Sequence, residues 1–248
     1  MSQKWLIKLE DVTISYKISR QLAKKYRTKR IFTPLTRINL TVNDKDFISI
    51  SGPNGSGKTS LLKIMSGLMR PFKGTVLWQA FNFGFVSQQQ ILLPELTIKE
   101  NILLPFYVGH EREKHNGAFD SSDEVDSLFK RLDNYVVRFN IENILEKSPK
   151  TCSIGQQQRA LLVRALTLDR DIIFGDEAEQ NLDADGRVEL FESFREANRA
   201  FGKTIVLVSQ EHPDVLKRYV TRSVKIKAGN LVDIYDEDRE SLVAPPQS

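Results

Sequence analysis

Residues 52–59 read Gly-Pro-Asn-Gly-Ser-Gly-Lys-Thr, an order of residue types suited to holding phosphate groups. Glycines let backbone N–H groups converge on phosphate oxygens without side-chain obstruction, and the lysine adds a positive charge. The apolar run 46–50 favours a strand before the loop, and the spacing of 60–65 favours a helix after it. The partly positive N-terminal end of that helix would then lie under the anion. The segment predicts a nucleotide-phosphate loop, with a chance match in a Ser/Gly-rich loop as the alternative.

A second group of residues could bind a metal ion and activate water. Asp176 and Glu177 follow the apolar run 172–175, which predicts a buried strand. A carboxylate at the end of a strand beside a phosphate loop can hold Mg²⁺ through water, while the hydroxyl of Thr59 ligates the ion directly. Glu177 is then placed to polarise an attacking water. The alternative interpretation is a charge pair at the start of a helix.

The elements that must position these groups alternate between strands and helices. The patterns predict strands at 5–16, 36–50, 171–175 and 204–208, further short strands within 74–85, and two more after 223. They predict helices at 60–69, 156–168 and 185–201, and an amphipathic helical region at 97–145 with a surface loop at 109–122. This alternation predicts a parallel sheet with helices on both faces. The polar end, 236–248, is expected to be frayed.

Length and composition set the class of protein. A chain of 248 residues makes one large domain or two small ones and can bury a core. No apolar stretch is long enough to cross a bilayer, and the N-terminus lacks the features of a signal peptide. Cys152 is the single cysteine, which excludes an internal disulfide and suits a reducing compartment. We expect a cytoplasmic protein whose membrane association comes through a partner or a surface patch.

The positive charge is concentrated in one segment. Residues 17–30 hold seven of the 36 basic residues and no acid, so the rest of the chain has 29 basic and 32 acidic residues. This distribution argues against a general nucleic-acid coat. One basic loop could instead meet phosphate, anionic lipid or an acidic protein face, or it could be a solvated surface insertion.

The order and spacing of several motifs resemble the ATP-binding cassette (ABC) family, the nucleotide-binding subunits of ABC transporters, over essentially the whole chain. Residues 52–59 resemble its Walker A motif, and 172–177 resemble Walker B with the catalytic glutamate. Residues 181–183 resemble the D-loop, and Cys152–Gln156 stand where the LSGGQ signature belongs. Residues 85–101 resemble the Q-loop region, closest to lipoprotein-release and macrolide-export ATPases.

The resemblance implies the fold and the domain organisation. The fold class is α/β: a P-loop NTPase with a mainly parallel sheet flanked by helices, an N-terminal antiparallel β subdomain and an inserted helical subdomain. Residues 1–248 would form a single ABC ATP-binding domain. Its core and β subdomain would cover about 1–90 and 169–235, and its helical subdomain about 91–168. The basic insertion is 17–30.

The resemblance also implies the ligands, ATP and Mg²⁺, and the residues that hold them. Each ATP would lie between the Walker motifs of one subunit and the signature of another. Nucleotide contacts would come from Tyr16, as the aromatic stacked on adenine, and from Gly52, Asn54, Gly55, Ser56, Gly57, Lys58 (β/γ-phosphates), Thr59, Ser60 (α-phosphate), Ser153, Gly155, Gln156 and Asp183. The metal would be held by Thr59, Gln88 and Asp176, and catalysis would fall to Glu177, Gln88 and Gln210. An ordinary strand tyrosine is the alternative at Tyr16.

Three positions depart from the family pattern. Ile154 replaces the first signature glycine, and Cys152 replaces the leucine; the bulk of isoleucine is expected to hold a phosphate off. Gln210 stands at the switch histidine; it can hydrogen-bond a γ-phosphate but brings no positive charge, and His212 is out of register to replace it. Ala178–Gln180 replace the usual turn after the glutamate. We expect ATP binding with slow hydrolysis, and one of two composite sites could be degenerate in an asymmetric pair.

The leading function is the energising subunit of a membrane transporter, with a second ABC subunit (identical or different) and an integral membrane subunit as partners. A nucleotide-gated regulatory or scaffolding protein is the alternative from another class. A soluble ABC protein acting on nucleic acid would need a second cassette or a long coiled coil, and neither is present. Extra sequence at 17–30 also resembles a polysaccharide-exporter subfamily, whose signature differs. An anionic lipid contact through 17–30 is a further expectation.

Overall fold

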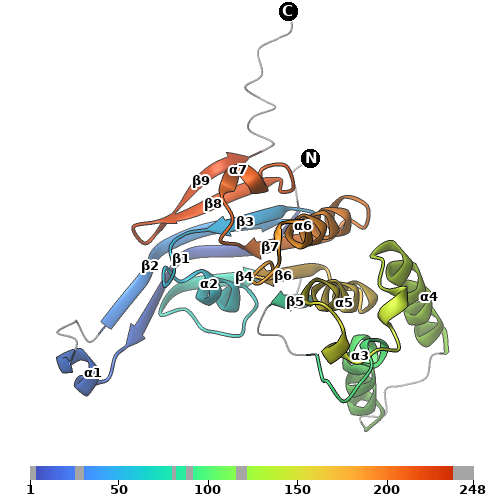
Figure 1. Cartoon of the computed structure of the whole chain (residues 1–248). Coiled ribbons are helices and arrows are strands. Elements are labelled where there is room, and N and C mark those ends of the chain that lie inside the picture. Colours follow the sequence, from blue (N-terminus) through green and yellow to red (C-terminus); the bar gives the residue numbers. More distant parts are fainter. Residues whose placement is uncertain (1–3, 26–30, 80–81, 88–91, 116–121, 237–248) are drawn as a thin grey trace, which may run out of the picture. The chain divides into compact units, whose positions relative to one another are not determined.

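The computed structural model describes residues 4–25, 31–79, 82–87, 92–115 and 122–236. The chain forms two compact units, one from Met1–Phe81 with Thr204–Ser248 and the other from Asn82–Lys203. Figure 1 follows the chain through both units. The sequence-predicted P-loop fold, with parallel strands, N-terminal antiparallel strands and helices, is confirmed.

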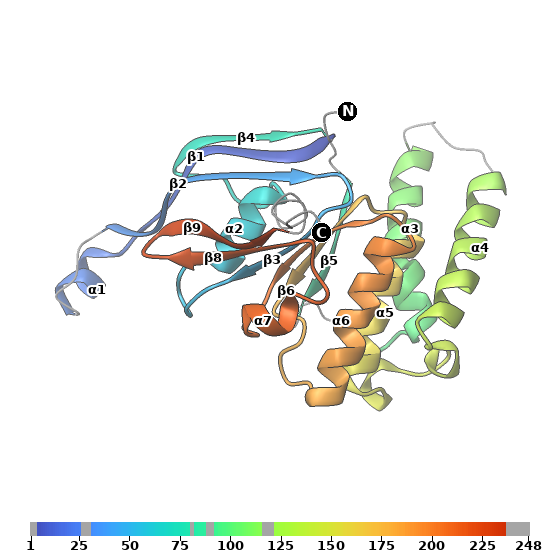
Figure 2. The ribbon, with the colours of Figure 1, turned by 90° about the horizontal axis from the view of Figure 1, so that it is seen from above.

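The first unit opens with an antiparallel sheet. β1 (Trp5–Lys17) lies between β2 (Ile31–Asn43) and β4 (Lys73–Trp78). Apolar side chains at Leu9, Val12, Leu35 and Ile38 are almost fully buried, which is the burial of one sheet face that strand alternation predicts. Beyond the body of this sheet β1 and β2 continue as a two-stranded ribbon, and the short helix α1 (Arg20–Lys25) lies at its end (Figures 1 and 2).

The same unit contains the strands that carry the phosphate loop. Their order is β7 (Thr204–Val208), β3 (Phe47–Ser51), β8 (Arg222–Lys227) and β9 (Asn230–Asp236); β3 is parallel to β7 and β8, and β9 is antiparallel to β8. Every residue of β3 and β7 is buried, as expected for parallel strands covered on both faces. Helix α2 (Lys58–Met65) follows β3, and the short α7 (Pro213–Leu216) follows β7.

The second unit is mainly helical. β5 (Phe83–Ser87) and β6 (Ile172–Asp176) form a parallel pair. Helix α5 (Ile154–Thr167) packs against α3 (Ile98–His115), α4 (Ser122–Arg138), α6 (Ala184–Arg199) and β5, and it is the centre of this unit. Gly84 allows the close contact with β5, since a Cβ there would lie 2.7 Å from the Cβ of Ala165. Two 3₁₀ turns, η1 (Glu142–Ile144) and η2 (Pro149–Thr151), lead into α5.

Several predicted boundaries move for identifiable reasons. The polar stretch 109–122 was expected to be a loop, but α3 continues through His115 and α4 begins at Ser122. The predicted strand 36–50 is two strands, separated by a turn in which Lys45 has φ +66°. The helix predicted at 156 begins at Ile154 because Ser153 caps it. Among the described residues, no helix combines the length and the apolarity needed to span a bilayer.

Candidate nucleotide site

The phosphate loop of the first unit joins β3 to α2. Gly52, Gly55 and Gly57 have φ values of +154°, +75° and +98°, a region that glycine enters without steric cost. Gly57 is the N-cap of α2 and makes no side-chain capping bond, and the first helical turn holds no acid. The N–H groups of this turn therefore face outward with the positive end of the helix dipole, which is the geometry that binds an anion.

Lys58 and Ser56 add side-chain donors to this loop. The Lys58 ammonium is buried and donates to the carbonyl oxygens of Gly52 at 3.0 Å and Pro53 at 3.2 Å. These carbonyls fold the lysine over the loop, where its charge can meet a phosphate. The Ser56 Oγ is buried with no hydrogen-bond partner. An orphaned buried hydroxyl is costly unless a ligand satisfies it, so this loop fits a bound phosphate.

Tyr16 lies beside the start of α2. Its hydroxyl forms a short hydrogen bond with the Ser60 Oγ, two residues after Lys58, and its ring remains 39 % exposed. In the register of the β1–β2 ribbon Tyr16 is directly opposite Phe32, which is 49 % exposed. Paired residues in an antiparallel ladder point to the same face, so two aromatic rings stand together near the loop.

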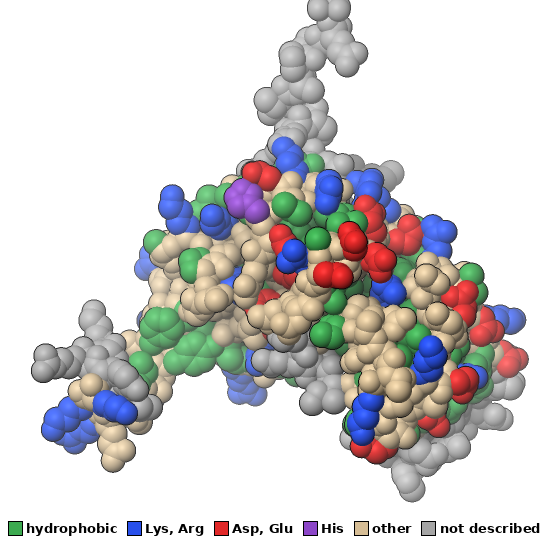
Figure 3. Space-filling view, viewed as in Figure 1, with side chains coloured by type: hydrophobic (Ala, Val, Ile, Leu, Met, Phe, Trp, Pro, Cys, Tyr) green, Lys and Arg blue, Asp and Glu red, His purple; other side chains and the backbone are tan. Residues whose placement is uncertain are grey.

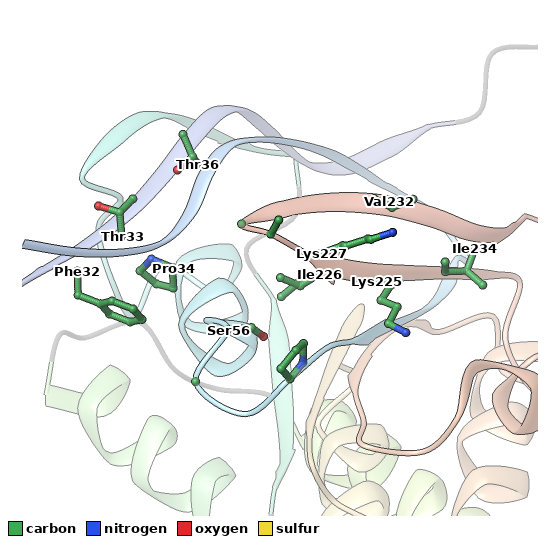
Figure 4. A pocket seen from close by; sticks show the side chains of 14 residues that line it. Phe32, Thr33, Pro34, Thr36, Ser56, Lys225, Ile226, Lys227, Val232 and Ile234 are labelled. Atoms are coloured by element: carbon green, nitrogen blue, oxygen red, sulfur yellow. The ribbon is translucent and has the colours of Figure 1, made fainter.

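A cavity of about 710 Å³ lies next to the phosphate loop within the first unit. Figure 4 shows Phe32 and Pro34 of β2 on one side of Ser56, and Ile226 and Lys225 of β8 on the other. The volume is in the range of pockets that bury a small ligand. Residues in this wall, notably Lys225 and Lys227, were not predicted from the sequence. The only available signal was their alternation with buried Val224 and Ile226.

The switch position also belongs to the first unit. Ile50 pairs with Val208 in the parallel ladder, so Gly52 and Gln210 each stand two residues beyond a paired position at the same sheet edge. Gln210 is exposed and lies beside the phosphate loop in this register. His212 instead caps α7: its Nδ1 accepts from the Asp214 N–H at 3.4 Å and lies 3.2 Å from the Asp214 carboxylate.

The carboxylates lie in the second unit. Asp176 ends β6, in register with Ser87 at the end of β5, and the next residue, Glu177, has a positive φ of +49°. A left-handed conformation is uncommon for glutamate, and here it turns the chain directly after Asp176 at the end of β6. The turn is closed by the Gln180 N–H donating to the Glu177 carbonyl at 3.0 Å. Gln88, the remaining predicted metal and catalytic residue, lies outside the described residues.

Thr59 and Asp176 provide the oxygen ligands that Mg²⁺ prefers. Thr59 is in the first turn of α2, next to Lys58, and Asp176 ends its strand partly exposed. Among the residues that the structure describes, no three His, Cys, Asp or Glu side chains gather into a metal cluster. Each side chain taken by itself offers an oxygen that suits this ion, Thr59 in the first unit and Asp176 in the second.

The signature segment begins α5 in the second unit. The Ser153 Oγ accepts from the Gln156 N–H at 3.2 Å, and the Gln156 Oε1 accepts from the Ser153 N–H at 2.9 Å, which is a complete capping box. The hydroxyl proton of Ser153 is not used in this pair and can be donated to an anion. Neither Ile154 nor Gly155 has a positive φ, so the backbone here does not need glycine. The side-chain bulk of Ile154, which is 44 % exposed, is therefore what distinguishes this position from a glycine.

Asp183 caps another helix. Its carboxylate accepts from the Gly186 N–H at 2.8 Å at the start of α6. Leu182 packs near the signature, since a Cβ on Gly155 would lie 3.8 Å from its Cδ2. Arg159 of α5 forms an ion pair with Glu189 of α6 at 2.5 Å, which fastens the two helices together. The segment 181–183 and the signature are thus joined within one unit.

A sequence model described as ABC transporter matches residues 35–180, more than half of the chain. The chain belongs to the ABC transporter family. Within that family it is an ABC-type ATPase cassette, and the matched range contains the phosphate loop, the signature and the carboxylates at the end of β6.

Relatives extend the match over nearly the whole cassette. It is 30 % identical over 242 residues to the lipoprotein-releasing system ATP-binding protein LolD 1 of Rhodopseudomonas palustris, covering 91 % of this chain and 98 % of that protein. It is also 30 % identical over 265 residues to the macrolide export ATP-binding/permease protein MacB of Syntrophobacter fumaroxidans. That match covers 98 % of this chain but 34 % of the longer protein.

Solved structures place the cassette in the same fold. The dimeric cassette MJ0796 of Methanocaldococcus jannaschii superposes with a TM-score of 0.72 at 28 % identity, covering 91 % of this chain and 96 % of that one. A dimeric post-hydrolysis state of MJ0796 bound to ADP and Pi also has a TM-score of 0.72, at 27 % identity over 92 % and 99 % of the chains. MJ0796 thus occurs as a dimer that holds ADP and Pi, the products of ATP hydrolysis.

Proposed function

We propose that this cassette is the ATP-binding subunit of a membrane transporter, that it binds Mg-ATP at the interface between two cassettes, and that it hydrolyses ATP slowly. The observation that carries the proposal is the phosphate loop of the first unit. Its helix end without a side-chain cap, the Lys58 ammonium folded over the loop and the buried Ser56 hydroxyl together suit a phosphate group.

The proposed role of each group follows the family pattern. Lys58 and the N–H groups of the first turn of α2 bind the β- and γ-phosphates, and Ser60 binds the α-phosphate. Thr59 and Asp176 hold Mg²⁺, which neutralises phosphate charge. Glu177 orients and polarises the attacking water, with Gln88 as its helper. The base and ribose lie beside Tyr16 and Phe32, where the 710 Å³ cavity adjoins the loop.

The signature segment would serve the other subunit's nucleotide. Ser153, Gly155 and Gln156 stand at a helix N-terminus, which would face the γ-phosphate held by a second cassette. The dimeric MJ0796 structures support this arrangement by similarity. The exposed side chain of Ile154 would stand in the way of that phosphate, which supports slow hydrolysis and a partner cassette that differs from this chain.

A membrane-embedded partner is the second part of the proposal. The matched MacB relative is named as an ATP-binding/permease protein, and this chain covers only a third of it. We propose an integral membrane transporter subunit as the partner that would hold the cassette at the cytoplasmic face of a membrane. The second unit offers a groove of about 590 Å³ for it, lined by Leu96, Leu103, Leu104, Tyr107 and Phe129 with charged side chains at its edge.

The experiment is a Glu177→Gln substitution in the complete transporter, reconstituted with its membrane partner. We expect ATP binding to persist, because Glu177 makes no predicted contact that binds the phosphates, while hydrolysis and transport are lost. Asp185→Asn, an exposed acid in the first turn of α6, is the matched control and should transport normally.

A nucleotide-gated regulatory or scaffolding protein is the second candidate, and Ile154 with Gln210 favours it. In that case the Glu177→Gln protein keeps its cellular activity, since nucleotide binding alone would operate the switch. Loss of cellular activity in Glu177→Gln would exclude this candidate, and full retention would exclude the energising subunit.

A further inference from the structure

The outer end of the β1–β2 ribbon is strongly basic; we call residues 16–25 with 31–32 the basic arm. Its basic side chains are all exposed: Lys17, Arg20, Lys24 and Lys25. No acid occurs anywhere between residues 17 and 30. Figures 1 and 2 both place α1 at the far end of the ribbon, away from α2, β8 and β9 of the same unit. In Figure 3 blue side chains gather on this arm at the lower left, with no red side chain in view on it.

Apolar side chains accompany the charges. Ile31 is 50 % exposed, and its neighbours Phe32 and Tyr16 are 49 % and 39 % exposed. A surface that combines cations with exposed aromatic and aliphatic groups suits the interface of an anionic bilayer, where lysines meet headgroups and apolar side chains enter the acyl boundary. Ile31 pairs with Lys17 at the outer end of the ribbon, so this exposed apolar side chain lies directly beside a cation of the arm.

The charge pattern favours a lipid surface over a nucleic acid. A protein that follows a phosphate backbone spreads lysines and arginines along one face. Here the remaining chain carries more acid than base, so the positive field is confined to the arm. A small cationic tip can reach a flat anionic surface, whereas it offers a duplex or a single strand little length to follow.

The root of the arm is built into the nucleotide site. Tyr16 and Phe32 are register partners in the β1–β2 ribbon, one pair before its outer end at Lys17 and Ile31. The Tyr16 hydroxyl is bonded to Ser60 in the first turn of α2, and Phe32 lines the cavity beside the phosphate loop. A ligand that binds the arm therefore acts on Tyr16 and Phe32, two residues that border the nucleotide site. Coupling of two binding events through shared residues is reciprocal.

We propose that the basic arm is a docking surface for anionic lipid headgroups and that its occupation changes the affinity of the cassette for nucleotide. The nucleotide part rests on the proposed function; the lipid part stands on the arm alone.

The experiment measures both events with the full chain. Sedimentation with vesicles of phosphatidylcholine alone, or mixed with phosphatidylglycerol, gives lipid binding, and a non-hydrolysable ATP analogue with Mg²⁺ is titrated with and without saturating vesicles. The arm variant is Lys24→Glu/Lys25→Glu, whose side chains are exposed. The matched control is Lys130→Glu/Lys147→Glu, an equal charge change at exposed positions of the second unit.

We expect the wild type and the control to bind only the anionic vesicles, and the arm variant to bind them at least about tenfold more weakly. Saturating anionic vesicles should change nucleotide affinity about fivefold in the wild type and the control, and leave it unchanged in the arm variant. Higher salt should weaken the lipid binding of the wild type.

Equal vesicle binding by the arm variant would overturn the proposal, as would an unchanged nucleotide affinity on saturating vesicles. Tighter binding of a short DNA duplex than of anionic vesicles at equal phosphate concentration would assign the arm to nucleic acid instead. Failure of the wild type to bind the analogue without vesicles would refute the proposed function and the linkage with it, while vesicle binding would still decide the lipid part.

Discussion

The ammonium group of Lys58 donates a hydrogen bond to the carbonyl oxygen of Gly52, 3.0 Å away and six residues earlier in the chain. The lysine thus closes the loop that it belongs to and holds its charge over the N-terminal end of α2. A phosphate entering this loop would replace two carbonyl acceptors with charged oxygens, and hydrogen bonds to charged groups are the stronger ones.

Replacing Lys58 with alanine should therefore weaken nucleotide binding by about 10- to 100-fold, the effect of one lost charge-assisted hydrogen bond. Lys63→Ala is the control, because Lys63 is an exposed lysine of the same helix. Titration of a fluorescent ATP analogue measures both. Equal affinities in the two variants would show that Lys58 does not contact the nucleotide.

Gly57 of the phosphate loop and Gly155 of the signature should differ in how well they tolerate replacement by alanine. Gly57 has φ +98°, and a Cβ there would lie 3.2 Å from the Leu35 Cγ, so Gly57→Ala should cost about 1–3 kcal/mol of unfolding free energy. Gly155 is helical, and its nearest neighbour would be 3.8 Å away, so Gly155→Ala should stay within about 1 kcal/mol of the wild type. Denaturant titration measures both, and an equal loss in the two variants would contradict this account.

The switch position should limit turnover. Gln210 stands beside the phosphate loop in the register of β3 and β7 but carries no charge. We expect Gln210→His to raise the steady-state ATPase rate by about tenfold or more, and Gln210→Ala to lower it, because one preorganised polar group is worth about 10²–10³ in rate at such a site. Glu211→Gln, at the adjacent position, serves as the control. A fast wild-type ATPase unaffected by Gln210→Ala would refute slow hydrolysis.

An ion pair in the second unit should make stability depend on pH. The hydrogen bond from Lys203 lowers the pKa of Asp169, against the opposing effect of partial burial, and the charges of Lys203 and Arg131 lower it further. The Lys203 Nζ lies 2.6 Å from the Asp169 Oδ1. Since the folded pKa lies below the unfolded value of about 3.9, the stabilisation is present above that pH and is lost as the pH falls through the folded pKa.

The unfolding free energy of the wild type should accordingly exceed that of Asp169→Asn at neutral pH, and the difference should shrink at about pH 3 and below. Asp171→Asn, an exposed acid two residues away, is the comparison and should show a smaller difference at neutral pH. Denaturant titrations across this pH range measure both differences. A difference for Asp169→Asn that stays constant with pH would contradict the assignment.

The phosphate loop and the alternation of strands and helices could be predicted because both are local. The glycine spacing of 52–59 sets its own backbone, and the apolar runs of β3 and β7 indicate buried strands without reference to the rest of the chain. The role of Asp183 as the N-cap of α6 was not predicted. A capping residue can be assigned only when the first residue of the helix is known, and helix boundaries are the least reliable feature that a sequence pattern gives.

The wall of the nucleotide cavity could not be predicted either. Phe32, Pro34 and Lys225 lie far apart in the sequence, and only the pairing of strands places them beside Ser56. Likewise α3 continues past Gly109 to His115, although the polar sequence there favours a loop. The pairing of strands, rather than local propensity, determines the cavity wall.

The burial of Cys152 gives this molecule a built-in reporter. Cys152 directly precedes the signature serine, Ser153, and is the only cysteine of the chain. It is 9 % exposed, and its Sγ donates a hydrogen bond to the Ser148 carbonyl. A thiol reagent can therefore modify one position only, and only when the turn before α5 opens. The rate of labelling, followed with and without nucleotide, would measure the local opening of the turn before α5 without any engineered cysteine.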